Sequence, residues 1–244
     1  MDAPMSDPTW LNPALDRAAL AETFARTGRI SIENVFLPEL AREIHACLAR
    51  ETPWGLVYNE GEKVVLLDNG QLRTLGREEI GRRQHQVLRQ AAEGRYAFFY
   101  QTYPILDHYL KGTNPGFFLN RVLEWVNSSE GLGLVRDVTG IPELVKADGQ
   151  ATLYAPGQFL LRHNDGHKDE HWRVAYVMNF TPDWNPDWGG HLQFLREDGG
   201  LEQVWAPRFN ALNLFRVPVW HSVSYVAPYA TAGRYGITGW FRDA

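Results

Sequence analysis

Residues 145–244 consist almost entirely of short segments in which apolar and polar side chains alternate, separated by Pro, Gly, Asn and Asp. Alternation with a period of two indicates strands, and closely spaced strands without helices between them are typical of an antiparallel sandwich or jelly-roll barrel. We expect eight strands here, at 145–154, 158–164, 172–181, 191–196, 201–205, 210–216, 219–227 and 234–242.

The first part of the chain has helical periodicity instead. In 38–50, apolar side chains recur on one helical face at Leu40, Ile44, Cys47 and Leu48. Residues 51–76 resemble short strands and turns, and further helices are expected at 13–27, 77–93, 117–126 and 129–138. Because helices bury their apolar faces against a sheet, we expect an α+β fold. It would be a double-stranded β-helix (jelly-roll) barrel with N-terminal helices packed on its outer face.

The length of 244 residues suits one large domain. Residues 1–12 have no periodicity and are expected to form a loose N-terminal tail. Residues 13–244 are expected to form a single domain, in which 13–144 supply helical support and 145–244 form the jelly-roll core. Residues 51–76, within the first part, are the candidate lid over a substrate site.

Composition excludes several classes of protein. The net charge of −5 creates no overall basic field, so direct nucleic-acid binding is not expected. Six arginines between 73 and 95 could form a basic patch, but a solvated helix face is favoured. The single Cys47 permits neither an intrachain disulfide nor a thiolate metal site. There is no apolar run of membrane-spanning length, and the acidic, polar start is unlike a signal peptide, so we expect a cytoplasmic location without membrane association.

A possible metal site begins with His163 and Asp165. On a strand, residues i and i+2 point to the same face, so this imidazole and carboxylate would project together. They would supply two of the three ligands of a 2-His-1-carboxylate triad, the usual site of non-haem Fe(II). Taken alone, the pair is weak evidence, because Asp165-Gly166 could simply form a turn.

A third ligand and a cation follow on later strands. His221 could complete the triad if distant strands of the barrel meet, although a lone histidine is more often a core residue. Thirteen residues further on, Arg234 shares a strand face with Thr238 and Trp240. An arginine inside an apolar barrel needs an anionic partner, and a guanidinium suits a carboxylate; the alternative is an exposed arginine at a strand start.

These motifs, in this order, resemble the Fe(II)/2-oxoglutarate dioxygenase superfamily, and within it the prolyl-hydroxylase branch. The supporting segments are Tyr154-Ala-Pro-Gly-Gln, Trp188-Gly-Gly-His-Leu, Asn213-Leu-Phe and the segment from Tyr229 to Trp240. The chain is most similar to the catalytic domain of ribosomal-protein prolyl hydroxylases. The similarity is specific over 145–242 and looser over 28–50.

The resemblance implies roles for particular residues. His163, Asp165 and His221 would hold Fe(II), and Arg234 would bind the distal carboxylate of 2-oxoglutarate. Tyr154 and Thr238 would assist, and Trp240 would wall the pocket. Asn179 occupies a cofactor-binding position where relatives often have tyrosine. O2 is the implied oxidant, with ascorbate as a further candidate, in the role of reductant.

The resemblance implies hydroxylation of a prolyl residue in a protein, with a ribosomal or translation-related protein as the candidate substrate. The eukaryotic relatives carry a second, degenerate barrel after the first, whereas this sequence stops at Ala244, which leaves the substrate and partner open. The same chemistry on a free amino acid or another small molecule is the alternative. More distant alternatives are a non-catalytic binding module and a zinc hydrolase that uses His163, His167 and His171, which are spaced as on one helical face.

Overall fold

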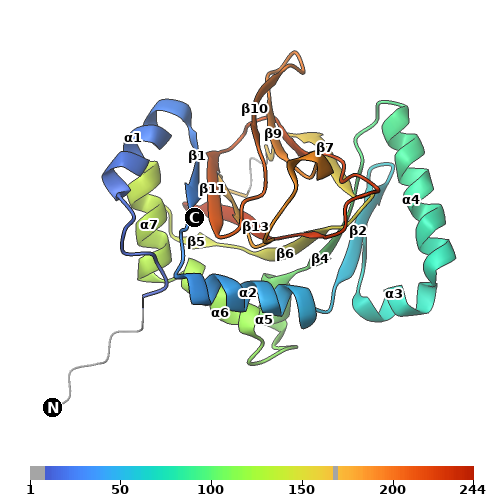
Figure 1. The fold of residues 1–244 in the computed structure, drawn as a ribbon, viewed down its shortest axis with the longest axis horizontal. Coiled ribbons are helices and arrows are strands. Elements are labelled where there is room, and N and C mark those ends of the chain that lie inside the picture. Colours follow the sequence, from blue (N-terminus) through green and yellow to red (C-terminus); the bar gives the residue numbers. More distant parts are fainter. Residues whose placement is uncertain (1–8, 167–169) are drawn as a thin grey trace.

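The computed structural model describes residues 9–166 and 170–244 (Figure 1). Its helices are α1 (Arg17–Thr27), α2 (Pro38–Arg50), α3 (Asn69–Leu75), α4 (Arg77–Ala92), α5 (Ile105–Lys111), α6 (Phe118–Val126) and α7 (Ser129–Thr139), with a 3-10 turn η1 (Pro186–Trp188). Its strands are β1 (Arg29–Glu33), β2 (Gly55–Glu60), β3 (Lys63–Leu67), β4 (Phe98–Tyr103), β5 (Lys146–Ala147), β6 (Gln150–Tyr154), β7 (Phe159–His163), β8 (Trp172–Asn179), β9 (Leu192–Leu195), β10 (Leu201–Trp205), β11 (Ala211–Arg216), β12 (His221–Val223) and β13 (Arg234–Arg242).

The strands form one antiparallel sheet that curls into a near-closed barrel. Its main path runs β1-β11-β8-β13-β6-β4-β7-β12-β9-β10, and β5 pairs with the end of β13. The two ends of this path are joined by side chains: Arg29 on β1 forms a 2.8 Å ion pair with Glu202 on β10. The Arg29 guanidinium also lies 4.5 Å from the ring centroid of Phe194, so one arginine bridges the open seam of the barrel.

Each barrel strand has one face toward the helices and one toward the interior. On β8, Val174, Tyr176 and Met178 belong to the main core beneath the helices, whereas Ala175 and Val177 belong to a separate interior cluster. This separation follows from the period-two geometry of a strand. The predicted jelly-roll architecture, with helices packed on the outer face, is confirmed.

Helices cover one side of the barrel, where α2, α5 and α6 run beneath the sheet in Figure 1. Their buried side chains, including Ile44, Val122 and Val138, join those of β8 and β11 in one apolar core. Burial of this surface is the main force that holds the helices on the sheet, at roughly 25 cal/mol per Å² of apolar area. No helix in the described residues is both long and apolar enough to cross a membrane.

Two expectations at the start of the chain were wrong. The first helix begins at Arg17 and not at 13, because the Asp16 side chain accepts a hydrogen bond from the Ala19 backbone and caps it. Residues 9–12 are packed against the core: Trp10 stacks on Trp125 at 5.7 Å, and Leu11 is 4% exposed. The expected loose tail therefore applies at most to residues 1–8, which lie outside the described residues.

The structure adds three elements that were not expected, β4, α5 and α3. The strand β4 pairs with β7 through its first residues and with β6 through its last, and so becomes part of the barrel wall, and helix α5 follows it directly. Residues 51–76 fold into the hairpin β2–β3 and helix α3, and this hairpin extends the sheet outward from β4. The arginine-rich stretch is largely neutralised by carboxylates, since Arg82 and Arg83 both pair with Glu79. This supports the interpretation of a solvated helix face.

Candidate metal centre and cosubstrate pocket

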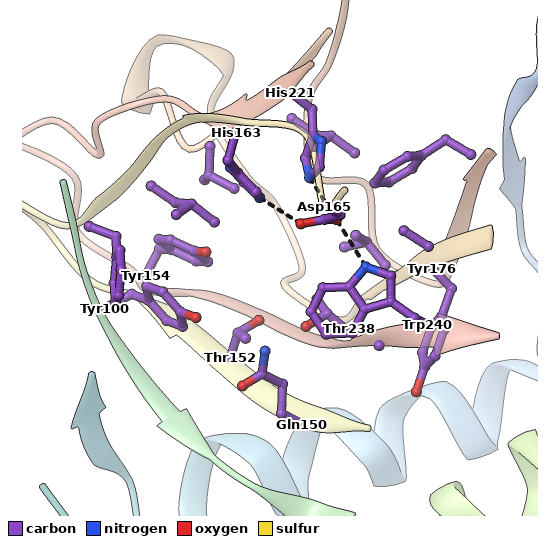
Figure 2. Close-up of a pocket in the computed structure, with 18 of the residues that line it drawn as sticks. Tyr100, Gln150, Thr152, Tyr154, His163, Asp165, Tyr176, His221, Thr238 and Trp240 are labelled. Atoms are coloured by element: carbon purple, nitrogen blue, oxygen red, sulfur yellow. Dashed lines mark hydrogen bonds and ion pairs between the residues drawn. The ribbon is translucent and has the colours of Figure 1, made fainter. Parts of the chain in front are cut away.

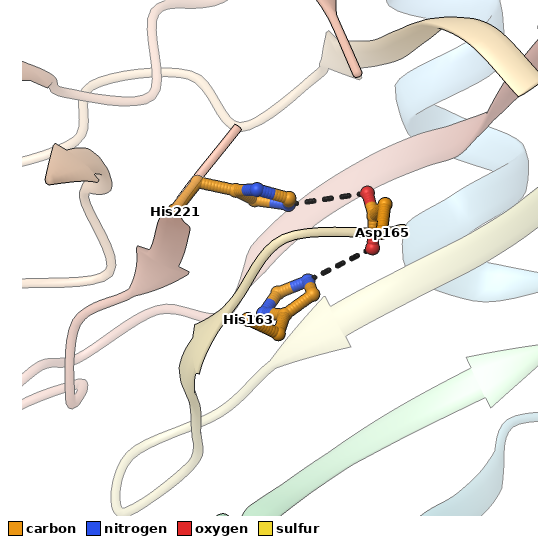
Figure 3. A group of neighbouring side chains, drawn as sticks. All are labelled: His163, Asp165 and His221. Atoms are coloured by element: carbon orange, nitrogen blue, oxygen red, sulfur yellow. Dashed lines mark ion pairs between the residues drawn. The ribbon is translucent and has the colours of Figure 1, made fainter. Parts of the chain in front are cut away.

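Strand pairing brings the two candidate histidines together. β7 and β12 are antiparallel neighbours, and His163 lies directly opposite His221 in their register. The Nε2 atoms of His163 and His221 each lie 3.3 Å from one oxygen of the Asp165 carboxylate (Figure 3). One ligand atom from each of the three side chains falls within 4.8 Å of the others, the spacing that a single metal ion requires.

Asp165 lies beside the histidines as expected, but strand geometry is not the reason. The strand β7 ends at His163, and Asp165 has a φ of +54°, in the left-handed region. Aspartate tolerates this conformation better than most residues, because its short side chain can bond locally. The carboxylate therefore reaches the histidines by a turn of the backbone after the strand, and the i, i+2 rule does not apply.

The two histidines have the same tautomer. Nδ1 of His163 contacts the backbone carbonyl of Leu161 at 2.9 Å, and Nδ1 of His221 contacts that of Val219 at 2.8 Å. Since a carbonyl oxygen only accepts, each Nδ1 carries the proton and donates it. In the neutral ring this leaves the lone pair on Nε2, on the side that faces Asp165. Such backbone contacts orient metal-binding histidines in many proteins.

The electrostatics of the cluster require a cation. Burial by itself raises the pKa of the Asp165 carboxyl, but the hydrogen bonds and charges of His163 and His221 outweigh burial and hold this pKa far below its usual range. The carboxylate is therefore anionic, and in the neutral tautomers two lone pairs point at it. That arrangement is stable only with a proton on each ring or with a metal ion among the three groups.

A tryptophan supports the carboxylate from the other side. The Trp240 indole Nε1 donates a 2.9 Å hydrogen bond to Oδ2 of Asp165 (Figure 2). The Trp240 ring stacks on Trp172, with centroids 4.3 Å apart and planes within 12°. Trp240 lines the cavity, and its polar edge has a specific contact besides.

The triad opens into a cavity of about 230 Å³ inside the barrel (Figure 2). The predicted residues Tyr154, Arg234, Thr238 and Trp240 all line it. Asn179 is not part of the lining but is buried behind Arg234. The lining residues that sequence reasoning missed include five on β6 and on or just before β4, because it missed β4 and assigned no role to the interior face of β6: Tyr96, Phe98, Tyr100, Gln150 and Thr152.

The missed aromatic residues shape the apolar wall. Tyr100 stacks on Tyr154 with ring centroids 4.9 Å apart, and burial raises the pKa of Tyr100 to about 12. Both rings are therefore neutral hydrogen-bonding groups at physiological pH. The richness of Phe98–Tyr103 in aromatic residues, which favour strands, was the signal that could have revealed this strand.

Arg234 is a buried cation without an anion. It is 4% exposed, and its guanidinium carbon lies 5.3 Å from the ring centroid of Tyr154, its partner in the β13–β6 register. Its Nη2 makes a long 3.4 Å contact with Oδ1 of Asn179, while its Nε has no hydrogen-bond partner. Among the described residues, no carboxylate pairs with Arg234. Burial lowers the pKa of this guanidinium, but an arginine stays charged in a protein.

The arrangement around Arg234 fits an anionic ligand. A buried, unpaired charge costs several kcal/mol, and a bound carboxylate would remove most of that cost. The amide Nδ2 of Asn179 is also buried without a partner, which provides a second unused donor beside the arginine. These orphaned donors and the triad are the features that Fe(II) with a bound 2-oxo diacid would satisfy.

The zinc interpretation of the histidine series is not supported. His163 lies on a strand, so the helical spacing to His171 has no geometric meaning, and His167 lies outside the described residues. His171 is exposed and contacts Asp243 at 3.5 Å. Within 9–166 and 170–244, only His163, Asp165 and His221 gather as a potential metal site.

Comparison with known proteins agrees with this geometry. Residues 149–242 match the family model of the 2OG-Fe(II) oxygenase superfamily, whereas no curated protein matches the chain. Among solved structures, a Pseudomonas putida prolyl-4-hydroxylase is 21% identical with a TM-score of 0.57, covering 93% of this chain and 98% of that one. A Burkholderia pseudomallei oxidoreductase of the 2OG-Fe(II) oxygenase family is 13% identical with a TM-score of 0.61, covering 95% and 92%.

A third structure is a Trichoplax adhaerens prolyl hydroxylase in complex with a peptide fragment of the hypoxia inducible factor oxygen degradation domain. It is 18% identical with a TM-score of 0.59, covering 93% of this chain and 89% of that one. At these identities the structural similarity establishes the fold alone. The segment that matches the family model, residues 149–242, contains all three residues of the His-Asp-His triad, and this match implies Fe(II) and 2-oxoglutarate as the cofactor and cosubstrate.

Proposed function

We propose that the protein hydroxylates a prolyl residue of a protein or peptide, with Fe(II) held by His163, Asp165 and His221. Arg234 binds the distal carboxylate of 2-oxoglutarate. The observation that carries this assignment is the unpaired, buried Arg234 in the same cavity as the triad. An unpaired buried charge destabilises the folded protein, and binding of a dicarboxylate would offset that cost.

Each protein group then has a defined task. Fe(II) with 2-oxoglutarate, when bound, supplies O2 activation and C–H oxidation coupled to release of succinate and CO2. His163 and His221 present unprotonated Nε2 atoms because their Nδ1 protons are held by backbone carbonyls. The apolar walls keep water away from the reacting centre, which protects a reactive intermediate from side reactions.

Five further residues complete the proposed cosubstrate site. Arg234 supplies charge, and Asn179 supplies an amide donor where a tyrosine was expected from the family pattern. Tyr154 and Thr238 line the same cavity and can each offer a hydroxyl group to the ligand. Trp240 closes the wall next to Asp165.

An extended substrate is supported by a row of side chains on the active-site face. Arg234 lies beside Tyr154, Tyr154 stacks on Tyr100, Tyr100 pairs with Val57, and Val57 pairs with Leu66. The row therefore crosses β13, β6, β4, β2 and β3 without a break. It leads from the buried arginine to the surface, a path that suits a chain longer than one amino acid.

The outer end of this row is apolar and exposed. Leu66 is 49% exposed, and Val64, two residues earlier on the same face of β3, is 60% exposed. Apolar side chains grouped beside a site often mark a binding surface for a protein partner. Two of the three similar structures are prolyl hydroxylases, and one of these holds a peptide. We therefore favour a protein or peptide substrate, with a ribosomal or translation-related protein as the candidate.

The alternative is the same chemistry on a free amino acid or another small molecule, which a cavity of about 230 Å³ could admit. We also propose that residues 13–244 act as one catalytic domain, with 51–76 as the part that contacts or covers the substrate. The two substrate classes differ in one measurable respect. A peptide-directed enzyme oxidises proline only within a chain, whereas a small-molecule enzyme accepts the free amino acid.

The test is formation of succinate from 2-oxoglutarate by protein loaded anaerobically with Fe(II) and then exposed to O2. Wild type should form succinate, and prolyl peptides should stimulate it more than free proline does. Asp165→Ala should form none. Arg234→Ala should need roughly 10- to 100-fold more 2-oxoglutarate, since hydrogen bonds to charged groups contribute about 1.5–3 kcal/mol.

Asp107→Ala, at an exposed position on α5, is the matched control and should behave as wild type. The assignment fails if wild-type protein forms no succinate and calorimetry shows that 2-oxoglutarate does not bind the iron-loaded protein. Equal stimulation by free proline and by prolyl peptides would instead favour the small-molecule alternative.

A further inference from the structure

The segment that carries Asp165 is not oriented by its own secondary structure. β7 ends two residues earlier, and the left-handed backbone of Asp165 turns its side chain away from the strand direction. A carboxylate on such a segment keeps one orientation only if other side chains hold it. Two neighbours on β13, Trp240 and Arg242, contact this segment.

Trp240 makes the first of these contacts. Its indole N–H is the only polar group of the side chain, and it points at Oδ2 of Asp165 at 2.9 Å. Its ring is fixed by the stack on Trp172. Its backbone N–H donates to Oδ1 of Asp148 at 2.8 Å, which fixes the strand at the same residue.

Arg242 makes the second contact. It lies two residues after Trp240 on the same face of β13, and its Nη1 donates to Glu170 at 3.1 Å. Its Nη2 forms an ion pair with Asp148 at 2.5 Å. Glu170 follows Asp165 by five residues and stands two residues before β8, so Arg242 holds the start of β8 near the Trp240 contact with Asp165.

We propose that Trp240 and Arg242, both organised by Asp148, form a clamp that positions the Asp165 carboxylate for metal binding. The Trp240 indole N–H donates to Oδ2 of Asp165, so Oδ1 of the same carboxylate is the better placed oxygen to bind the ion. Trp240 and Arg242 are positioning residues: both act through Asp165 and its segment. This inference rests on the proposed function, because it takes the triad as the metal site.

Loss of the clamp should weaken metal binding without removing a ligand. Replacement of groups that orient a metal ligand typically costs 10- to 100-fold in affinity. Trp240→Phe keeps an aromatic ring against Trp172 but removes the indole N–H that donates to Asp165. Arg242→Gln keeps a polar side chain but removes the charge that holds Glu170 to Asp148.

The experiment is titration of the metal-free full chain with Mn(II), followed by calorimetry and by the EPR spectrum of the bound ion. Trp240→Phe should bind Mn(II) roughly tenfold more weakly and with an altered EPR spectrum. Arg242→Gln should show a smaller loss. The controls are Trp205→Phe, whose ring packs on Phe194 away from the cavity lining, and Arg17→Gln, which breaks an exposed ion pair.

Both controls should bind Mn(II) as wild type does, even if their melting temperatures fall. Wild-type affinity and spectrum in Trp240→Phe would overturn the clamp while leaving the metal site intact. If Trp240→Phe does not fold, Arg242→Gln decides: reduced affinity supports the clamp and unchanged affinity overturns it. Failure of the wild-type protein to bind Mn(II) would instead contradict the proposed function.

Discussion

His163 and His221 lie directly opposite each other in the pairing of β7 and β12, with ring centroids 4.1 Å apart. The two rings have the same orientation toward their backbones, because each Nδ1 donates a hydrogen bond to the backbone carbonyl of the residue two positions earlier. The sheet therefore places two equivalent nitrogen donors at one point before any metal binds. Such preorganisation reduces the conformational entropy that ligand ordering would otherwise cost.

Metal binding should stabilise the native protein through this pair. At a metal concentration 100 times the dissociation constant, the gain is about 2.7 kcal/mol, which corresponds to roughly 5–10 °C in melting temperature for a chain of this size. His221→Ala should lose this shift, whereas His85→Ala, at an exposed position on α4, should keep it. Thermal denaturation with and without Mn(II) measures the effect. An equal shift in His221→Ala would show that the ion binds elsewhere.

Replacement of the buried arginine should have opposite effects on stability and on ligand binding. Arg234→Met removes an unpaired buried charge and retains a long side chain, so the free energy of unfolding of the ligand-free protein should rise by about 1–4 kcal/mol. The same variant should lose 2-oxoglutarate binding. Urea denaturation and calorimetry measure the two effects. Destabilisation of the ligand-free variant would show that protein groups already satisfy Arg234.

The exposed apolar face of β3 should contribute to binding of a peptide substrate. Val64→Asp places a charge on this face and should raise the KM for a prolyl peptide about tenfold, since burial of a valine contributes roughly 1.5 kcal/mol. Val204→Asp is the matched control, at a 43% exposed position on β10 at the far end of the sheet. Steady-state kinetics distinguish the two. If both variants change KM alike, the effect is one of charge alone and not of docking on β3.

Stability should fall at acidic pH because of a partly buried histidine outside the metal site. Burial lowers the pKa of His45 below the usual value of 6.5, the charge of Arg50 acts in the same direction, and a backbone hydrogen bond at Phe180 partly opposes them. Below about pH 6.5, His45 therefore binds a proton more readily in the unfolded chain than in the folded protein. The contribution of neutral His45 to the free energy of unfolding is therefore complete above about pH 6.5 and decreases as the pH falls toward the pKa of His45 in the folded protein.

Urea denaturation between about pH 7.5 and pH 5, a range that spans the usual pKa of histidine, tests this prediction. His45→Gln should reduce the slope of unfolding free energy against pH in that range. His85→Gln, on the exposed face of α4, serves as control and should leave the slope unchanged. An unchanged slope in His45→Gln would assign the acid sensitivity to other groups.

Period-two alternation was sufficient to predict the strand regions of residues 145–244 within a few residues, since burial on one face imposes it directly; only the segment 145–154 divides into two strands, β5 and β6. The strand β4 was missed although Phe98–Tyr103 is rich in aromatic residues, because it stands alone among helices. Its place beside β6 and β7 depends on hydrogen bonds to residues 48 to 62 positions away, which no local pattern encodes. The residues Phe98 and Tyr100 were lost from the predicted site for the same reason.

The sequence alone determined the chemistry of the site, because residue types and their order on strands selected His163, Asp165, His221 and Arg234. Tertiary structure decided how these groups are held. Asp165 lies in a left-handed turn fixed by Trp240, and Arg234 is left unpaired because strand register places Tyr154 and Asn179 beside it. Local sequence fixes only the identity and the face of a side chain, whereas its distance to a partner depends on the closure of the whole barrel.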